Sequence, residues 1–123
     1  MDLSNTARVL GAGRALIGAA LLAAPGTVAL RWLGEVSERP GAQVAISGVG
    51  ARDLVLGLGT VWALGGRKRD VRPWLIASGI ADMVDLTAAL RFRKGLTAPA
   101  VGGTAAVAGG SAVLCFWLQS ELG

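Results

Sequence analysis

The stretch GVGARDLVLGLGTVWAL, residues 48–64, decides how the chain folds. It is apolar and rich in glycine, and residues 41–64 together supply the roughly 20 apolar positions that a helix needs to cross a bilayer. Arg52 and Asp53 then fall near the middle of the membrane, where a charge costs at least about 2.5 kcal/mol. Such side chains normally face the inside of a helical bundle, so this stretch predicts a membrane protein with a buried charged site.

The composition fits a small membrane protein. Of 123 residues, 53% are hydrophobic and 16% are charged, which suits a single domain and is unlike a disordered chain. Alanine and glycine supply much of the apolar fraction, which weakens the membrane signal and leaves a soluble helical bundle as an alternative. The net charge of +4 comes mainly from short basic clusters beside apolar runs. Because no basic stripe with interleaved aromatic residues is present, we expect a lipid bilayer as partner and no nucleic acid.

Four apolar segments predict an all-α fold, a four-helix transmembrane bundle that forms one domain over residues 1–123. The expected spans cover about residues 6–30, 41–64, 71–90 and 96–120. Ala24-Pro25-Gly26 should kink or end the first of them, because proline removes a backbone hydrogen bond. Arg14 interrupts the apolar core that a signal peptide would need, so we expect this segment to be retained. The expected location is the cell inner (plasma) membrane, as a multi-pass protein.

Loop charges give no orientation in this four-span scheme. Five basic residues fall on one side, namely Arg8, Arg67, Lys68, Arg69 and Arg72. Five fall on the other, namely Arg31, Arg39, Arg91, Arg93 and Lys94. The positive-inside rule therefore chooses neither side. A tie is what a dual-topology protein would show, and four spans enclose a pathway poorly, so we expect a homo-oligomer, with an antiparallel dimer as one form.

Small and polar residues share one face in several segments. The second segment has Gly50, Asp53, Gly57 and Thr60 at i, i+3, i+7 and i+10. The third has Ser78, Asp82 and Asp85 at i, i+4 and i+7. The fourth has Gly102, Ala106 and Gly110, a ladder of small residues that predicts close helix packing or a subunit contact. The glycines of GAGRALIG, residues 11–18, favour close helix contact too, because no strand precedes them as a dinucleotide-binding motif requires.

Three stretches resemble the small DoxX-like four-helix membrane proteins. They are TARVLGAGRALIGAALLAAP (residues 6–25), GARDLVLGLGTVWAL (50–64) and PWLIASGIADMVDLTAAL (73–90). The most specific parts are the Gly-Ala-Arg-Asp of residues 50–53 and the Ala-Asp-x-x-Asp of residues 81–85. The resemblance covers nearly the whole chain and implies a four-helix membrane fold. It implies no function, because the family's activity is not established.

Five ionisable residues fall at membrane depth, namely Arg14, Arg52, Asp53, Asp82 and Asp85. If all are charged, three negative charges face two positive ones, and a dry interior disfavours the excess charge. We therefore expect one carboxyl group to be protonated, or to be neutralised by a bound cation or by water. The alternative is a salt-bridge network that only fixes the packing of the helices.

Two classes of function fit this cluster. In the first, the protein is a proton-coupled carrier or channel for a small cationic or neutral solute, and Asp82 or Asp85 exchanges the proton. In the second, it is a membrane-embedded enzyme whose carboxyl groups, Asp53 included, supply acid and base to isomerise, cyclise or open an epoxide in a lipophilic substrate. An accessory subunit that binds a partner helix is a third possibility.

The substrate-binding candidates beside the carboxylates are Arg52, Arg14, Ser78 and Thr60. Neither hydroxyl residue has a histidine or lysine base beside it, so neither predicts a nucleophile. The chain has no histidine, and its single cysteine, Cys115, lies in an apolar run as a small hydrophobic residue would. We therefore expect no metal ion and no cofactor.

Overall fold

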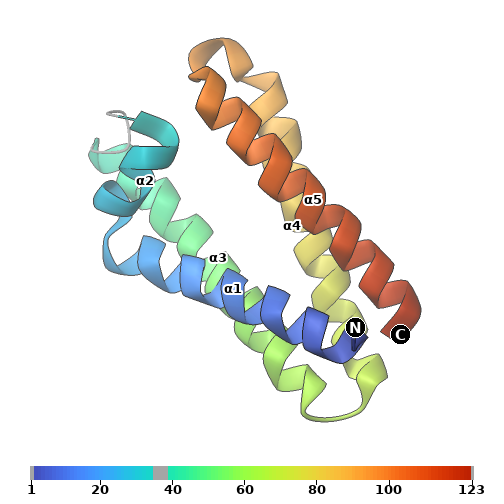
Figure 1. Ribbon diagram of the computed structural model, residues 1–123. Helices are drawn as coiled ribbons and strands as arrows, with labels where there is room; N and C mark the ends of the chain where they lie inside the picture. Colours follow the sequence, from blue (N-terminus) through green and yellow to red (C-terminus); the bar gives the residue numbers. More distant parts are fainter. Residues whose placement is uncertain (1, 35–38, 123) are drawn as a thin grey trace.

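The computed structural model describes residues 2–34 and 39–122, and the regular structure within them is helical (Figure 1). The long helices are α1 (Leu3–Ala23), α3 (Pro40–Leu64), α4 (Arg72–Arg91) and α5 (Ala98–Leu122). A short helix, α2 (Pro25–Leu33), follows α1, and the 3-10 turns η2 (Lys68–Val71) and η3 (Arg93–Gly95) flank α4. The predicted all-α, four-helix bundle is thereby confirmed.

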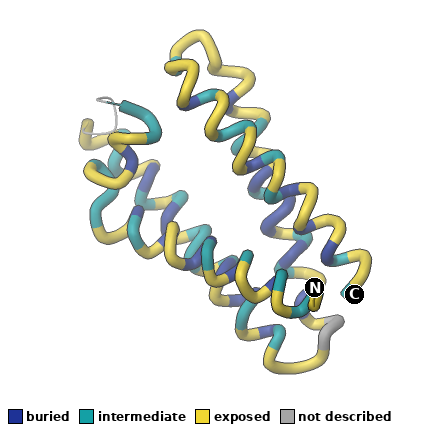
Figure 2. The backbone as a smooth tube through the Cα atoms, in the orientation of Figure 1, coloured by how far each residue is buried: buried dark blue, intermediate teal, exposed yellow. Residues whose placement is uncertain are grey.

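Each long helix is long and apolar enough to cross a membrane. At 1.5 Å per residue they extend between roughly 30 and 38 Å, which covers a hydrocarbon core of about 30 Å. Exposed residues run along all four long helices (Figure 2), and they include large apolar ones: Leu16, Val44 and Trp62 are 72%, 74% and 78% exposed. A soluble bundle would bury such residues, whereas lipid covers them in a bilayer. The chain is therefore a multi-pass membrane protein.

The predicted first segment, residues 6–30, forms two helices. Asp2 caps α1 by accepting a hydrogen bond from the Ser4 N–H at 2.9 Å. α1 ends at Ala23 because the residue before a proline is driven out of the helical conformation, and Ala24 has φ −145° and ψ 69°. Pro25 then begins α2, and Gly34 ends it with a φ of 79°. Part of the expected connection over residues 31–40, residues 35–38, lies outside the described residues.

The four long helices form two pairs that diverge from a common end (Figure 1). α1 runs along α3, and α4 runs along α5, whereas contacts between the pairs are less extensive. Both termini and the α3–α4 connection lie at the end where the pairs meet, and α2 and the α4–α5 connection lie at the open end (Figure 1). The space between the two pairs is where the candidate site lies.

Glycines bring α1 and α3 into backbone contact. Gly11 and Gly18 on α1 face Gly57 and Gly50 on α3, two helical turns apart on each helix. A Cβ atom added at Gly18, Gly50 or Gly57 would lie 3.0 Å or less from backbone atoms of the other helix. Membrane helices gain stability through such close packing, because lipid offers no hydrophobic force to join them. The small face predicted on the second segment is therefore the contact with α1.

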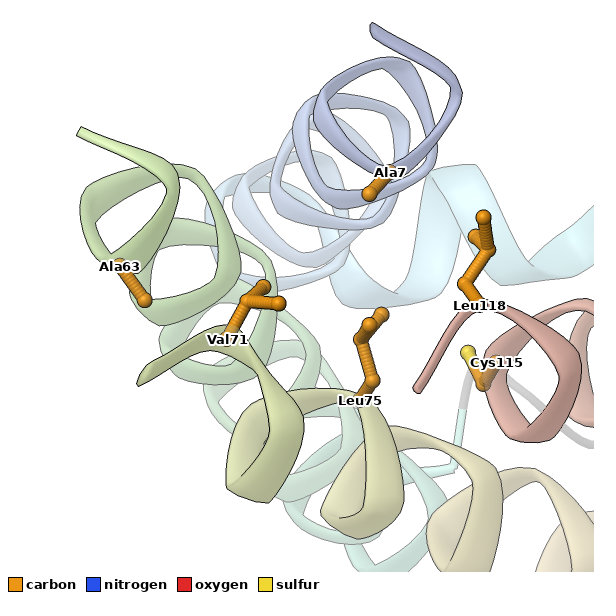
Figure 3. Packing of buried hydrophobic residues seen from close by; sticks show 6 residues of the cluster. All are labelled: Ala7, Ala63, Val71, Leu75, Cys115 and Leu118. Carbon is orange, nitrogen blue, oxygen red and sulfur yellow. The ribbon is translucent and has the colours of Figure 1, made fainter. Parts of the chain in front are cut away.

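An apolar cluster closes the end where the pairs meet (Figure 3). Its buried members are Ala7, Ala63, Val71, Leu75, Cys115 and Leu118. They come from α1, α3, η2, α4 and α5, so side chains from every long helix meet at this end. The cluster therefore fixes the point from which the two pairs diverge.

The ladder of small residues on α5 does not pack against another helix of this chain. Ala106 is exposed, and a Cβ atom added at Gly102 or Gly110 would meet nothing within 4 Å. The expectation of close packing there is wrong within the described chain, because α5 turns a different face to α4. On that face the ring of Phe116 lies against Gly79.

Candidate functional site

The contact between α1 and α3 places the first pair of charges. Arg14 lies between the two contact glycines of α1, and Asp53 lies between those of α3. Both side chains therefore project from the faces that touch, and Arg14 Nη1 donates to Asp53 Oδ1 at 3.1 Å. The sequence placed Asp53 on this face, but the partner on α1 follows from the pairing of the two helices.

Arg14 also joins α1 to the other helix pair. Its Nη2 atom donates to Asp82 Oδ2 on α4 at 2.5 Å and to Ser111 Oγ on α5 at 3.0 Å. A single guanidinium group thus contacts side chains from α3, α4 and α5. Arginine suits this role because its planar fork carries five N–H donors. The link lies near the middle of each helix, and Ser111 Oγ lies 4.0 Å from Cys115 Sγ, which belongs to the apolar cluster.

Arg52 forms a second link between α3 and α4. Its Nη1 and Nη2 atoms donate to Asp85 Oδ1 and Oδ2 at 2.9 and 2.7 Å, which is the bidentate geometry of a strong charged pair. Arg52 Nη2 also donates to Asp53 Oδ1 at 3.1 Å. Asp53 is therefore shared by both arginines. The five charged residues form one continuous chain, in the order Asp82, Arg14, Asp53, Arg52 and Asp85.

The two ends of this chain differ in burial. The side chains of Arg14 and Asp82 are only 8% and 6% exposed, whereas those of Arg52 and Asp85 are 29% and 26% exposed. A charge pair with little access to solvent gains more from its partner and loses more when the partner is removed. Loss of Arg14 should therefore cost more stability than loss of Arg52.

A cavity of about 590 Å³ lies against the charged residues, between the two helix pairs. Arg14, Asp53, Asp82, Asp85 and Ser111 form its polar wall. The remaining lining residues are apolar except for Thr104, and they include Ile17, Leu21, Val28, Val49, Trp32 and Val107. This volume falls within the range of about 300–1,000 Å³ that is typical of small-molecule sites. The site is thus an apolar cavity with charged groups on one side.

Three predicted site residues lie away from this cavity. Arg52 does not line it and instead donates hydrogen bonds to Asp53 and Asp85, which do. Thr60 packs near Gly11 and donates to the backbone carbonyl of Leu56 at 2.8 Å, so its hydroxyl is occupied within α3. Ser78 is buried, and its hydroxyl has no hydrogen-bond partner among the described residues. Their role in binding a substrate stays a prediction, and none of the three lines the cavity.

Sequence reasoning missed the contributions of α5 and α2. Ser111 contacts Arg14, and Thr104 Oγ1 accepts a hydrogen bond from Trp32 Nε1 at 2.8 Å, which ties α2 to α5 beside the cavity. Thr104 and Ser111 are spaced at i and i+7, so they lie on one face of α5. This spacing was the available signal. Trp32 lines the cavity as well.

The charges of the site do not balance when every group is ionised. Three carboxylates against two guanidinium groups leave one negative charge in excess if every group is ionised. Within residues 2–34 and 39–122, no group of three or more His, Cys, Asp or Glu side chains is placed to hold a metal ion.

Comparison of the chain with protein-family models, with curated proteins and with solved structures finds no match.

Proposed function

We propose that the protein is a small proton-coupled carrier, in which the carboxyl group of Asp82 exchanges a proton as a small solute enters the cavity. One observation carries this proposal: the charged chain has one carboxylate more than it has arginines, and that chain lines a cavity. A buried excess charge is costly, so the empty carrier binds a proton. Binding of a solute that can replace this proton is then coupled to release of the proton.

Asp82 fits the exchanging role better than the other two carboxylates. Asp85 uses both oxygens in its bidentate pair with Arg52, and Asp53 accepts hydrogen bonds from two guanidinium groups. Among the described residues, Asp82 accepts a hydrogen bond only through Oδ2. Its Oδ1 atom can therefore carry a proton while Oδ2 keeps its contact with Arg14. With Asp82 protonated, the remaining two carboxylates balance the two arginines.

A membrane-embedded enzyme is the second candidate, and the apolar lining of the cavity favours it. A lipophilic substrate would sit among the aliphatic side chains with its reacting group at the carboxyl groups. Protonated Asp82 would act as the acid, and Asp53 or Asp85 as the base. The two candidates differ in one observable respect, because an enzyme converts its substrate in detergent solution, where no gradient exists, and a carrier leaves it unchanged.

The carrier proposal also includes an assembly and a location. Four helices that diverge at one end do not enclose a path across the bilayer, so we propose that the protein acts as a homo-oligomer in the plasma membrane. An antiparallel dimer agrees with the equal loop charges. Substituting Arg67, Lys68 and Arg69 by Gln should then bias insertion toward one orientation, reported by fusions at the C-terminus. A wild-type protein that inserts in one orientation only would remove the antiparallel arrangement.

Infrared spectroscopy of the purified protein tests the protonated carboxyl group directly, without knowledge of the solute. We expect a protonated-carboxyl band at neutral pH in the wild type and its loss in Asp82→Asn. The matched control is Asp70→Asn, because Asp70 is exposed outside the site. Asp82→Asn should also keep its thermal stability, since an amide and a neutral acid are similar in size and donate alike.

Two results would overturn the proposal. The first is the absence of the band in the wild type, or its persistence in Asp82→Asn. The second is an equal loss of thermal stability in Asp53→Asn, Asp82→Asn and Asp85→Asn, because the charged chain would then serve only to hold the helices together.

A further inference from the structure

The cavity combines one excess negative charge with a mostly apolar lining, and together these features select a class of solute. When Asp82 gives up its proton, the charged chain carries a charge of −1, from three carboxylates and two guanidinium groups. A monovalent cation restores neutrality, a neutral solute leaves the charge unbalanced, and an anion doubles it. A buried charge without a partner is the costliest of these states, so charge balance favours the cation.

The lining of the cavity excludes a small hydrated ion. Beyond the charged residues, the walls are formed mainly by aliphatic side chains and by the indole of Trp32. The α5 residues that line it run from Gly103 to Ser111, which is roughly 12 Å at 1.5 Å per residue. An inorganic cation would lose its hydration shell there, and most side-chain oxygen atoms in the wall already accept hydrogen bonds from Arg14, Arg52 or Trp32. An apolar body of about this length would instead replace water along the walls.

We propose that the solute of this site is an amphipathic monovalent cation, an organic ammonium compound whose charged nitrogen lies at Asp82 and whose apolar body lies among Ile17, Val49 and Val107. This inference rests on the proposed proton exchange at Asp82. On binding, the O–H bond of Asp82 breaks and the proton passes to water. The carboxylate formed then pairs with the ammonium group, so the total charge of the site does not change.

Isothermal titration calorimetry with three ligands of matched shape tests this inference. The ligands are benzyltrimethylammonium, its uncharged carbon isostere neopentylbenzene, and the anion benzylsulfonate. Titration of the full chain in detergent, in two buffers that differ in ionisation enthalpy, gives both the affinity and the number of protons released. We expect the cation to bind with release of about one proton, and the other two ligands to bind about tenfold more weakly or worse.

Two variants separate the role of Asp82 from that of surface charge. Asp82→Asn should bind the cation about tenfold more weakly and release no proton, because the amide group does not ionise at neutral pH. Asp70→Asn, which removes an exposed carboxylate outside the site, should bind and release a proton as the wild type does. Thermal stability of Asp82→Asn in the same detergent shows that the variant is folded.

The outcomes distinguish this inference from the proposed function. If neopentylbenzene or benzylsulfonate binds as tightly as the cation and releases a proton through Asp82, the solute class is wrong and the proton exchange stands. If the cation does not bind, or binds to Asp82→Asn as to the wild type, the inference is wrong. The infrared band of Asp82 still decides the proposed function in either case.

Discussion

Removal of Arg14 should cost more stability than removal of Arg52, although both residues pair with two aspartates. The Arg14 side chain is 8% exposed and that of Arg52 is 29% exposed. Breaking a buried pair by removing one partner costs about 3–5 kcal/mol, which we expect for Arg14→Met. Where water still reaches the carboxylate that loses its partner, the cost is nearer that of an unsatisfied polar group, about 1–3 kcal/mol, which we expect for Arg52→Met.

Methionine is the substitution of choice because it keeps an unbranched side chain and removes every donor. The measurement is reversible unfolding in mixed micelles, in which added dodecyl sulfate unfolds the helices and circular dichroism follows the loss. Arg67→Met is the matched control, since Arg67 is exposed in the α3–α4 connection and should change the free energy of unfolding by no more than about 0.5 kcal/mol.

A double variant tests the assignment of the partner. If Asp82 is protonated, as proposed, loss of Arg14 leaves the Asp53 carboxylate unbalanced, so the cost of Arg14→Met together with Asp53→Asn should differ from the sum of the single costs by about 0.5–3 kcal/mol, in the direction of rescue. Equal costs for Arg14→Met and Arg52→Met, or strict additivity in the double variant, would refute the idea that burial makes Arg14 the more sensitive of the two arginines.

Three further predictions concern the packing and the membrane. Gly18→Ala should lower the free energy of unfolding by about 1–3 kcal/mol, because its Cβ would overlap the α3 backbone, whereas Gly102→Ala, which meets nothing within 4 Å, should be neutral or stabilising in the same assay. Trp32→Phe should lower the free energy of unfolding by about 0.5–1.5 kcal/mol, because the hydrogen bond to Thr104 is lost, and adding Thr104→Val should lower it little further. If the effects of the two substitutions simply add, the contact is contradicted. In a Cys115→Ala background, Val55→Cys should resist a water-soluble maleimide although its side chain lies on the outer surface, and labelling at the rate of a loop residue would contradict the membrane span.

The sequence by itself determined the class of fold. Four apolar segments of about 20 residues have few structures open to them in a bilayer, because every backbone N–H and C=O must be satisfied within the segment. The helix break at Pro25 and the helix faces that carry the charged residues also followed from local rules. Proline ends the helix before it, and the spacing of residues fixes which of them share a face. For this reason the set of five charged residues could be named before their contacts were known.

Only the tertiary structure decided which charges meet. Periodicity places Asp53 on one face of α3, but it does not say that α1 covers that face, because the pairing of helices depends on close contacts between glycines far apart in sequence. That pairing turned Thr60 into the α1–α3 interface, and the packing of α5 against α4 left the Gly102 ladder facing outward. Arginine side chains are long enough to reach several partners, so the link from Arg14 to Asp82 and Ser111 required the positions of all four helices. The cavity likewise belongs to no single segment, since it arises from the divergence of two helix pairs.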